Sequence, residues 1–160
     1  MSDVFTVKVT GLSQLQERLE SLPKKVAQRI IRTTLKDIGN VLRNDMADLA
    51  PKHTGLMSEN FNVIVRLTGN ELAARAWVGP KQGVYYPGGD KKKGSATGKN
   101  PKKGGTISTR SVARFQEFGT EGEHPIPAND FMKRAFDQWQ PYGLSEMIAA
   151  IKDELDKAGA

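Results

Sequence analysis

The sequence predicts one α+β domain, in which a small antiparallel sheet of about four strands packs against a long helix and a second helix. Residues 60–67 and 72–78 alternate apolar and polar side chains around a short turn, as in a β-hairpin. Residues 23–50 repeat apolar side chains at the period of a helix. The chain has 160 residues, which is the usual size of one domain, and we expect residues 1–160 to form it.

The first half of the chain predicts a strand followed by two helices. Residues 4–10 alternate in the manner of a strand. Ser13 and Gln16 have the spacing of a capping box, which predicts the start of a short helix. Pro23 suits the first turn of the long helix, and Pro51 ends it.

The polar face of this long helix is basic and lacks acidic residues. It is either an ordinary solvated face or a basic surface that meets an acidic partner or DNA. The residues of this face are Lys25, Arg29, Arg32, Lys36 and Arg43.

The second half predicts one more strand and two more helices. Residues 111–118 are expected to form a strand that ends at a glycine turn. A helix over 129–139 is expected to be capped by Asn129 or Asp130. A proline and a glycine then separate it from a last amphipathic helix over 144–155.

The net charge of +6 is concentrated in one segment. Residues 81–110 hold seven lysines, one arginine and one aspartate, so the remainder of the chain is close to neutral. Within them, residues 87–110 lack periodicity and are rich in glycine and lysine, which predicts a flexible insertion loop. This loop is either simply solvated or contacts DNA or an acidic protein surface. Its candidate contact residues are Lys91, Lys92, Lys93, Lys99, Lys102, Lys103 and Arg110.

The chain offers no set of residues typical of an enzyme, and we expect no catalytic site, cofactor or metal. His53 and His124 lie beside or near prolines and are far apart in the sequence. Glu117 has no second carboxylate or histidine nearby in the sequence, so an ion pair or a ring contact is expected for it. With no cysteine in the sequence, thiolate metal sites and disulfides are excluded, and a reducing compartment is expected. Neither a secretory signal nor a membrane span is indicated.

Three patterns in register resemble those of the neck and tail-completion proteins of long-tailed bacteriophages. The first is Gly11-Leu12 followed by a short and a long helix, and the second is Ala50-Pro51-Lys52-His53-Thr54-Gly55-Leu56-Met57-Ser58. The third is Phe115-Gln116-Glu117-Phe118-Gly119-Thr120, followed by prolines, Phe131-Met132 and Ala135-Phe136. The resemblance covers residues 11–79 and 111–139. The interposed 87–110 segment and the spacing of Pro127 from Phe131 depart from the family pattern.

This resemblance implies a virion structural protein without enzymatic activity, related in fold to tail terminators. The implied assembly is a homo-oligomeric ring, with six copies expected, at the head–tail junction. Its partners would be head-closure or connector proteins, tail-tube or terminator proteins and, through non-specific contact, packaged DNA. It would be assembled in the host cytoplasm. One rival interpretation is a nucleic-acid-binding module that acts through residues 81–110. A second is a small hydrolase, for which His53, His124 and Glu117 would be the residues to test. Candidate interface or structural residues are Pro51, Thr54, Gly55, Glu117, Phe118, Gly119, Thr120, Phe131 and Phe136.

Overall fold

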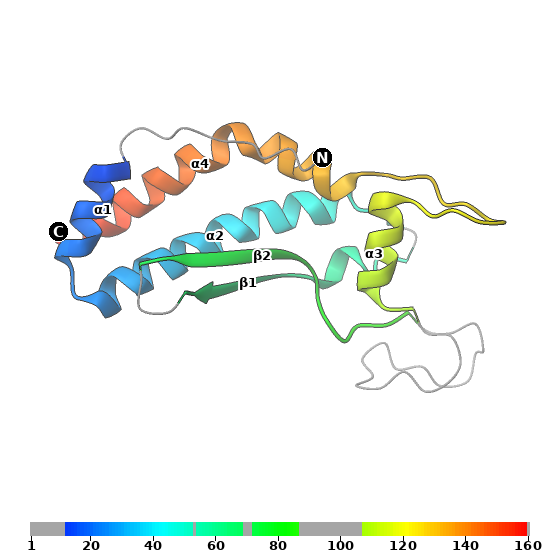
Figure 1. The fold of residues 1–160 in the computed structure, drawn as a ribbon, viewed down its shortest axis with the longest axis horizontal. Helices are drawn as coiled ribbons and strands as arrows, with labels where there is room; N and C mark the ends of the chain where they lie inside the picture. The colour runs from blue at the N-terminus through cyan, green and yellow to red at the C-terminus, as the bar shows by residue number, and fades with distance from the viewer. Residues whose placement is uncertain (1–11, 53, 69–71, 87–106, 160) are drawn as a thin grey trace.

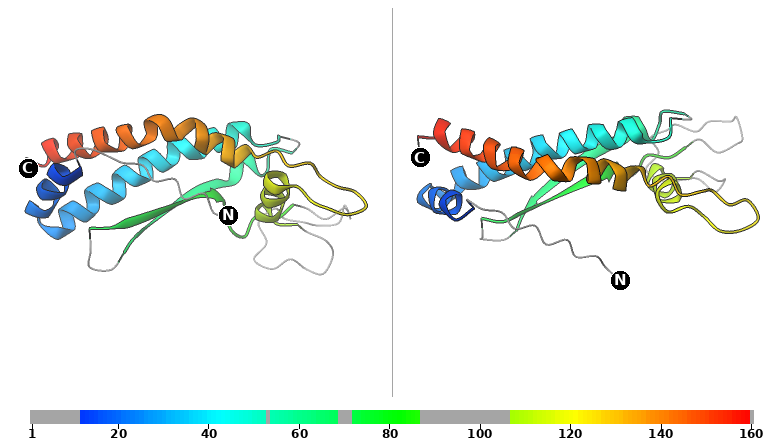
Figure 2. Two further views of the ribbon diagram at one scale, coloured as in Figure 1. Left: turned by 45° about the horizontal axis from the view of Figure 1, so that its top comes forward. Right: turned by 90° about the horizontal axis from the view of Figure 1, so that it is seen from above.

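The computed structural model describes residues 12–52, 54–68, 72–86 and 107–159. Helix α2 forms the centre, with helix α4 along one side and a β-hairpin along the other (Figures 1 and 2). Helices α1 and α3 lie at opposite ends of this elongated arrangement (Figure 1). The elements are α1 (Leu12–Ser21), α2 (Lys24–Leu49), the 3-10 turn η1 (Ser58–Asn60), β1 (Phe61–Leu67), β2 (Ala74–Pro80), α3 (Thr109–Phe118) and α4 (Phe131–Lys157).

The structure confirms the predicted short helix, the long helix and the hairpin. Strands β1 and β2 pair antiparallel from Phe61 opposite Pro80 to Leu67 opposite Ala74. The turn at 69–71 and the strand predicted at 4–10 lie outside the described residues.

The predicted sheet of about four strands is wrong for the described residues, where it has two strands. Residues 111–118, predicted as a strand, form most of α3 instead. The Ser108 side chain accepts a hydrogen bond from the Ser111 amide and caps this helix. Thr109, Ala113 and Glu117 are buried at four-residue intervals, so the burial pattern follows the period of a helix.

The two helices predicted over 129–139 and 144–155 are a single helix, α4, that continues through Pro141. Gly143 is buried in this helix, and a Cβ atom at this position would collide with the Trp139 ring. Glycine here therefore makes room for the aromatic ring and does not end the helix. Tertiary packing along the length of α4 outweighs the local cost of a proline in the helix.

The core consists of two hydrophobic clusters at opposite ends of α2. One lies beneath α3 and the start of α4, and the other lies beneath α1 and the end of α4. The first contains Leu42, Met46, Ala50, Met57, Phe61, Ala113, Phe131 and Ala135. The second contains Leu15, Leu19, Ala27, Ile30, Ile31 and Leu155.

Between these clusters, α2 approaches the hairpin closely at Gly39. A Cβ atom on Gly39 would lie 2.6 Å from a methyl carbon of Val63 on β1. Valine has a stiff side chain, so it cannot easily move aside. The missing side chain of Gly39 thus sets the distance between the helix and the sheet.

Replacement of Gly39 by alanine is expected to destabilise the fold by about 1–3 kcal/mol because it overpacks this contact. At a solvent-exposed position in a helix, replacement of glycine by alanine stabilises by roughly 1 kcal/mol. Destabilisation therefore indicates a close contact at Gly39. Urea unfolding, monitored by circular dichroism, measures the change in the free energy of unfolding. Thr33→Ala on the exposed face of α2 is the control and should shift stability by only about 0.5 kcal/mol. Stabilisation by Gly39→Ala would contradict the close approach.

Candidate assembly surface

The side chain of Glu117 joins α3 to the start of α4. It is only 5% exposed, and its two carboxylate oxygens accept hydrogen bonds from the backbone N–H groups of Met132 (2.8 Å) and Lys133 (2.9 Å). These N–H groups belong to the first turn of α4, where no carbonyl of the helix can satisfy them. A carboxylate is also favoured there by the helix dipole. Glu117 therefore caps α4 from a different helix.

This result corrects the prediction that Asn129 or Asp130 caps the helix. Asp130 occupies the capping position, but its side chain makes no capping bond and its backbone has a left-handed φ of 50°. Asn129 contributes through its backbone amide, which donates to the Gln116 carbonyl at 2.7 Å. We call these three hydrogen bonds, two to the Glu117 carboxylate and one to the Gln116 carbonyl, the Glu117 clasp.

The clasp holds the base of a projecting segment, residues 119–130, which we call the arm. The arm extends away from α3 and α4 at one end of the molecule (Figure 1). The Thr120 amide donates to the Ile126 carbonyl, and the Thr120 hydroxyl accepts from the Ile126 amide, both at 2.9 Å. Gly119 has a φ of 74°, and a Cβ atom there would lie 2.8 Å from the Ile126 carbonyl oxygen. The predicted glycine turn is present, although it follows a helix.

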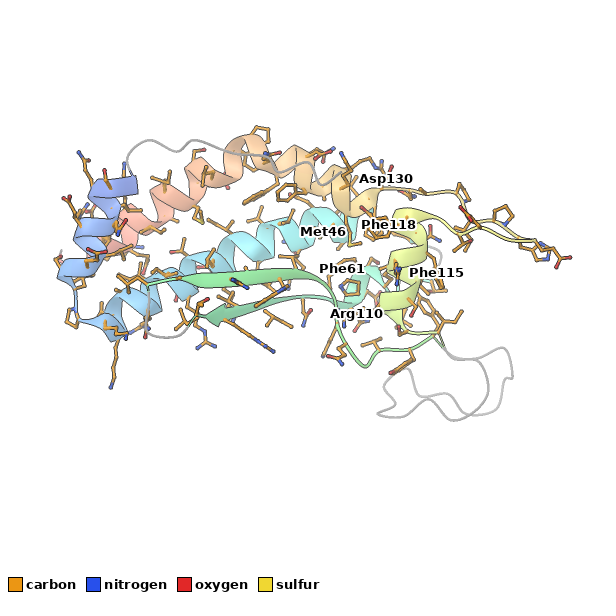
Figure 3. The ribbon with its side chains drawn as sticks, in the orientation of Figure 1. Met46, Phe61, Arg110, Phe115, Phe118 and Asp130 are labelled. Carbon is orange, nitrogen blue, oxygen red and sulfur yellow. The ribbon has the colours of Figure 1, made fainter. Side chains whose placement is uncertain are left out.

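The aromatic residues of the third sequence motif divide into buried and exposed groups. Phe131 is fully buried and packs edge-to-face on Phe61, with ring centroids 6.1 Å apart. Phe118 is 74% exposed, and with the partly exposed Phe115 it lines a hollow at the base of the arm. Figure 3 shows Phe61 and Met46 in the interior and Phe118 near Asp130 at the base of the arm. Phe136 on α4 is also exposed.

The second motif turns the chain from α2 into β1. Pro51 follows the end of α2, and Gly55 has a positive φ of 73°. The Gly55 carbonyl accepts hydrogen bonds from the Ser58 hydroxyl (2.9 Å) and the Glu59 amide (3.0 Å). Thr54 is exposed beside this turn. These residues shape the connection at the same end of the molecule as α3.

The basic residues separate into two groups. The six candidate lysines at 91–103 lie outside the described residues, whereas Arg110 is exposed on the first turn of α3. Arg110 and Lys81 border the outer face of the hairpin, where the Arg66 guanidinium lies 5.7 Å from the centre of the Trp77 ring.

The described residues contain no group of three or more side chains that could hold a metal ion. His124 is exposed on the arm, and His53 lies outside the described residues. Both oxygens of Glu117 are engaged with backbone amides. No helix in the described part of the chain is long and apolar enough to cross a membrane.

Residues 13–119, two thirds of the chain, match the family described as "Bacteriophage HK97-gp10, putative tail-component". The chain belongs to the HK97 gp10-like family of phage tail components. No match was found among the curated proteins or among the solved structures. The matched residues run from α1 to Gly119 after α3, and the rest of the arm and α4 follow them. Membership of this family indicates a phage structural component, in agreement with the resemblance noted in the sequence.

The sequence named Glu117 as a candidate interface or structural residue, with an ion pair or a ring contact expected, and did not reveal that its carboxylate caps α4. Its partners are backbone amides 15 and 16 residues further along the chain, which have no sequence signature. A usable signal was Ser108, because serine is a preferred residue at the start of a helix.

Replacement of Glu117 by glutamine is expected to lower the free energy of unfolding by about 1–3 kcal/mol. The carboxamide has one acceptor oxygen, so one N–H group at the start of α4 loses its partner. Urea unfolding measures the loss, with the exposed arm variant Glu121→Gln as the isosteric control. Equal stability of the two variants would show that the clasp does not hold the fold.

Proposed function

We propose that this chain is a bacteriophage or prophage virion protein of the neck or tail-completion class. In this proposal, identical subunits form a ring at the head–tail junction that completes the tail and connects it to the head. Family membership supports a tail component. The observation that carries the assembly role is the pair of exposed rings, Phe115 and Phe118, which line one hollow beside the clasped arm, because adjoining exposed apolar side chains favour a protein interface.

The arm suits such an interface because it is already ordered. A segment fixed by the clasp and by Thr120 loses little conformational freedom on binding, so more of its contact energy contributes to association. The proposed partners are further copies in a hexamer, with head-closure or connector proteins on one side and tail-tube or terminator proteins on the other. The proposed location is the top of the virion tail, after assembly in the host cytoplasm.

A second candidate is a nucleic-acid-binding module that acts through residues 81–110. The exposed Lys81, Arg110 and Arg66 around Trp77 favour it, since basic and aromatic side chains together suit a nucleic acid. Deletion of residues 90–105 separates the two candidates. Loss of affinity for duplex DNA with intact assembly supports the second, whereas failure to join heads to tails with unchanged DNA affinity supports the first.

Replacement of Phe118 by alanine is expected to weaken self-association at least tenfold while changing the free energy of unfolding by only about 0.5 kcal/mol. The reason is that its ring is exposed and contributes little to the core. The matched control is Phe131→Ala, which removes a buried ring and should destabilise the fold by about 3–5 kcal/mol. Light scattering coupled to size exclusion measures the association.

The role in the virion is tested by deleting the gene from the phage or prophage that carries it. The proposal predicts separate heads and tails in electron micrographs. The wild-type gene supplied in trans should restore joined particles, and the Phe118→Ala gene should not. Normal virions after the deletion would contradict the proposed function.

A further inference from the structure

The arm is ordered but does not pack against its own chain. Its residues 121–128 are all exposed, although Thr120 and Ile126 pair through two hydrogen bonds and the clasp fixes its base. A segment that is held out into solvent in one conformation has the properties of a preformed ligand for another surface.

The chemistry of the arm specifies the surface that it fits. Residues 119–130 contain three acidic residues and neither lysine nor arginine. Glu121 and Glu123 are exposed, and no ion pair involves them among the described residues. Ile126 adds an exposed apolar side chain. The complementary surface is therefore basic, with a small apolar element.

Such a surface exists on the first half of α2, and we call it the α2 basic stripe. It consists of Lys25, Arg29, Arg32 and Lys36. These side chains are exposed on one face of the helix, and none forms an ion pair or a side-chain hydrogen bond with the described part of the chain. Next to them lies a shallow depression of about 240 Å³, lined by Lys25, Gln28, Arg29, Arg32, Thr33 and Leu67. Leu67, at the end of β1, supplies the apolar element.

The arm and the α2 basic stripe lie at opposite ends of the molecule, so one copy cannot join them (Figure 1). Two complementary surfaces that do not overlap on the same chain produce a head-to-tail contact, which closes into a ring when its rotation permits. A second copy therefore satisfies both charged surfaces at once. DNA bound to the stripe would leave the acidic arm without a partner.

We propose that the arm of one copy binds the α2 basic stripe of the next copy, with Glu121 and Glu123 facing Arg29 and Arg32 and with Ile126 against Leu67. This inference rests on the proposed ring and names the surfaces that form it. It also assigns a role to the basic face of the long helix.

The test uses charge reversal in two double variants of the full chain, Glu121→Lys with Glu123→Lys and Arg29→Glu with Arg32→Glu. Each variant alone places like charges at the contact, so the apparent Kd for self-association should rise at least tenfold. In an equimolar mixture, contacts between unlike variants pair opposite charges, so a ring in which the two variants alternate should recover association to within about threefold of the wild type. Analytical ultracentrifugation measures all of these samples.

Matched controls reverse exposed charges on α4, with Glu146→Lys and Lys152→Glu, and should leave self-association unchanged. Circular dichroism establishes that each variant folds. If a reversal variant does not fold, the neutral pair Glu121→Gln with Glu123→Gln removes the attraction without adding charge and should weaken association several-fold.

The outcomes separate this inference from the proposed function. A wild-type chain that stays monomeric at high concentration overturns both. A wild-type chain that assembles, with reversal variants that assemble equally well or a mixture that does not recover, overturns the arm–stripe contact and leaves the ring intact. Loss of duplex DNA binding by Arg29→Glu with Arg32→Glu, with self-association unchanged, assigns the stripe to DNA and overturns the contact.

Discussion

The buried carboxylate of Glu117, bonded to the first turn of α4, is the interaction on which the rest of the molecule depends. Burial of a carboxylate is costly unless its oxygens are paired. Here both oxygens receive backbone N–H groups, and the positive end of the helix dipole adds to the attraction. The same two bonds satisfy amides that α4 cannot satisfy itself. The position of α3 relative to α4 is fixed as a result.

These bonds determine the path of the chain at one end of the molecule. The 119–130 segment connects two helices whose ends are tied together by Glu117 and by the bond from Asn129 to Gln116. The chain between these ties must leave the surface and return, and Gly119 and Thr120 direct it outward. The apolar cluster around Phe131 supports the clasp from beneath, while Phe118 is left exposed beside it. The opposite end, under α1, carries the basic half of α2. An elongated subunit with different surfaces at its two ends is suited to head-to-tail assembly.

Elements with strong local signals could be predicted from the sequence. The long helix has a proline just before its start and another just after its end, and the hairpin alternates around a short turn. Residues 111–118 form a helix instead of the predicted strand because Ala113 and Glu117 are buried at helical spacing against other segments, which the local sequence does not show. Pro141 predicts a break between two helices, but α4 continues through it. Local sequence patterns do not show that the Trp139 ring packs over Gly143 in this helix. The clasp depends on contacts between separate segments, so local sequence patterns could not predict it.

Amide hydrogen exchange measured by NMR at Met132 and Lys133 tests the central claim most directly. First-turn amides of a helix ordinarily exchange quickly because no carbonyl of the helix binds them. If the Glu117 carboxylate holds them, both amides should be protected nearly as well as amides in the interior of α4, and the Glu117→Gln variant should lose this protection. Fast exchange at both positions in the wild-type protein would contradict the account.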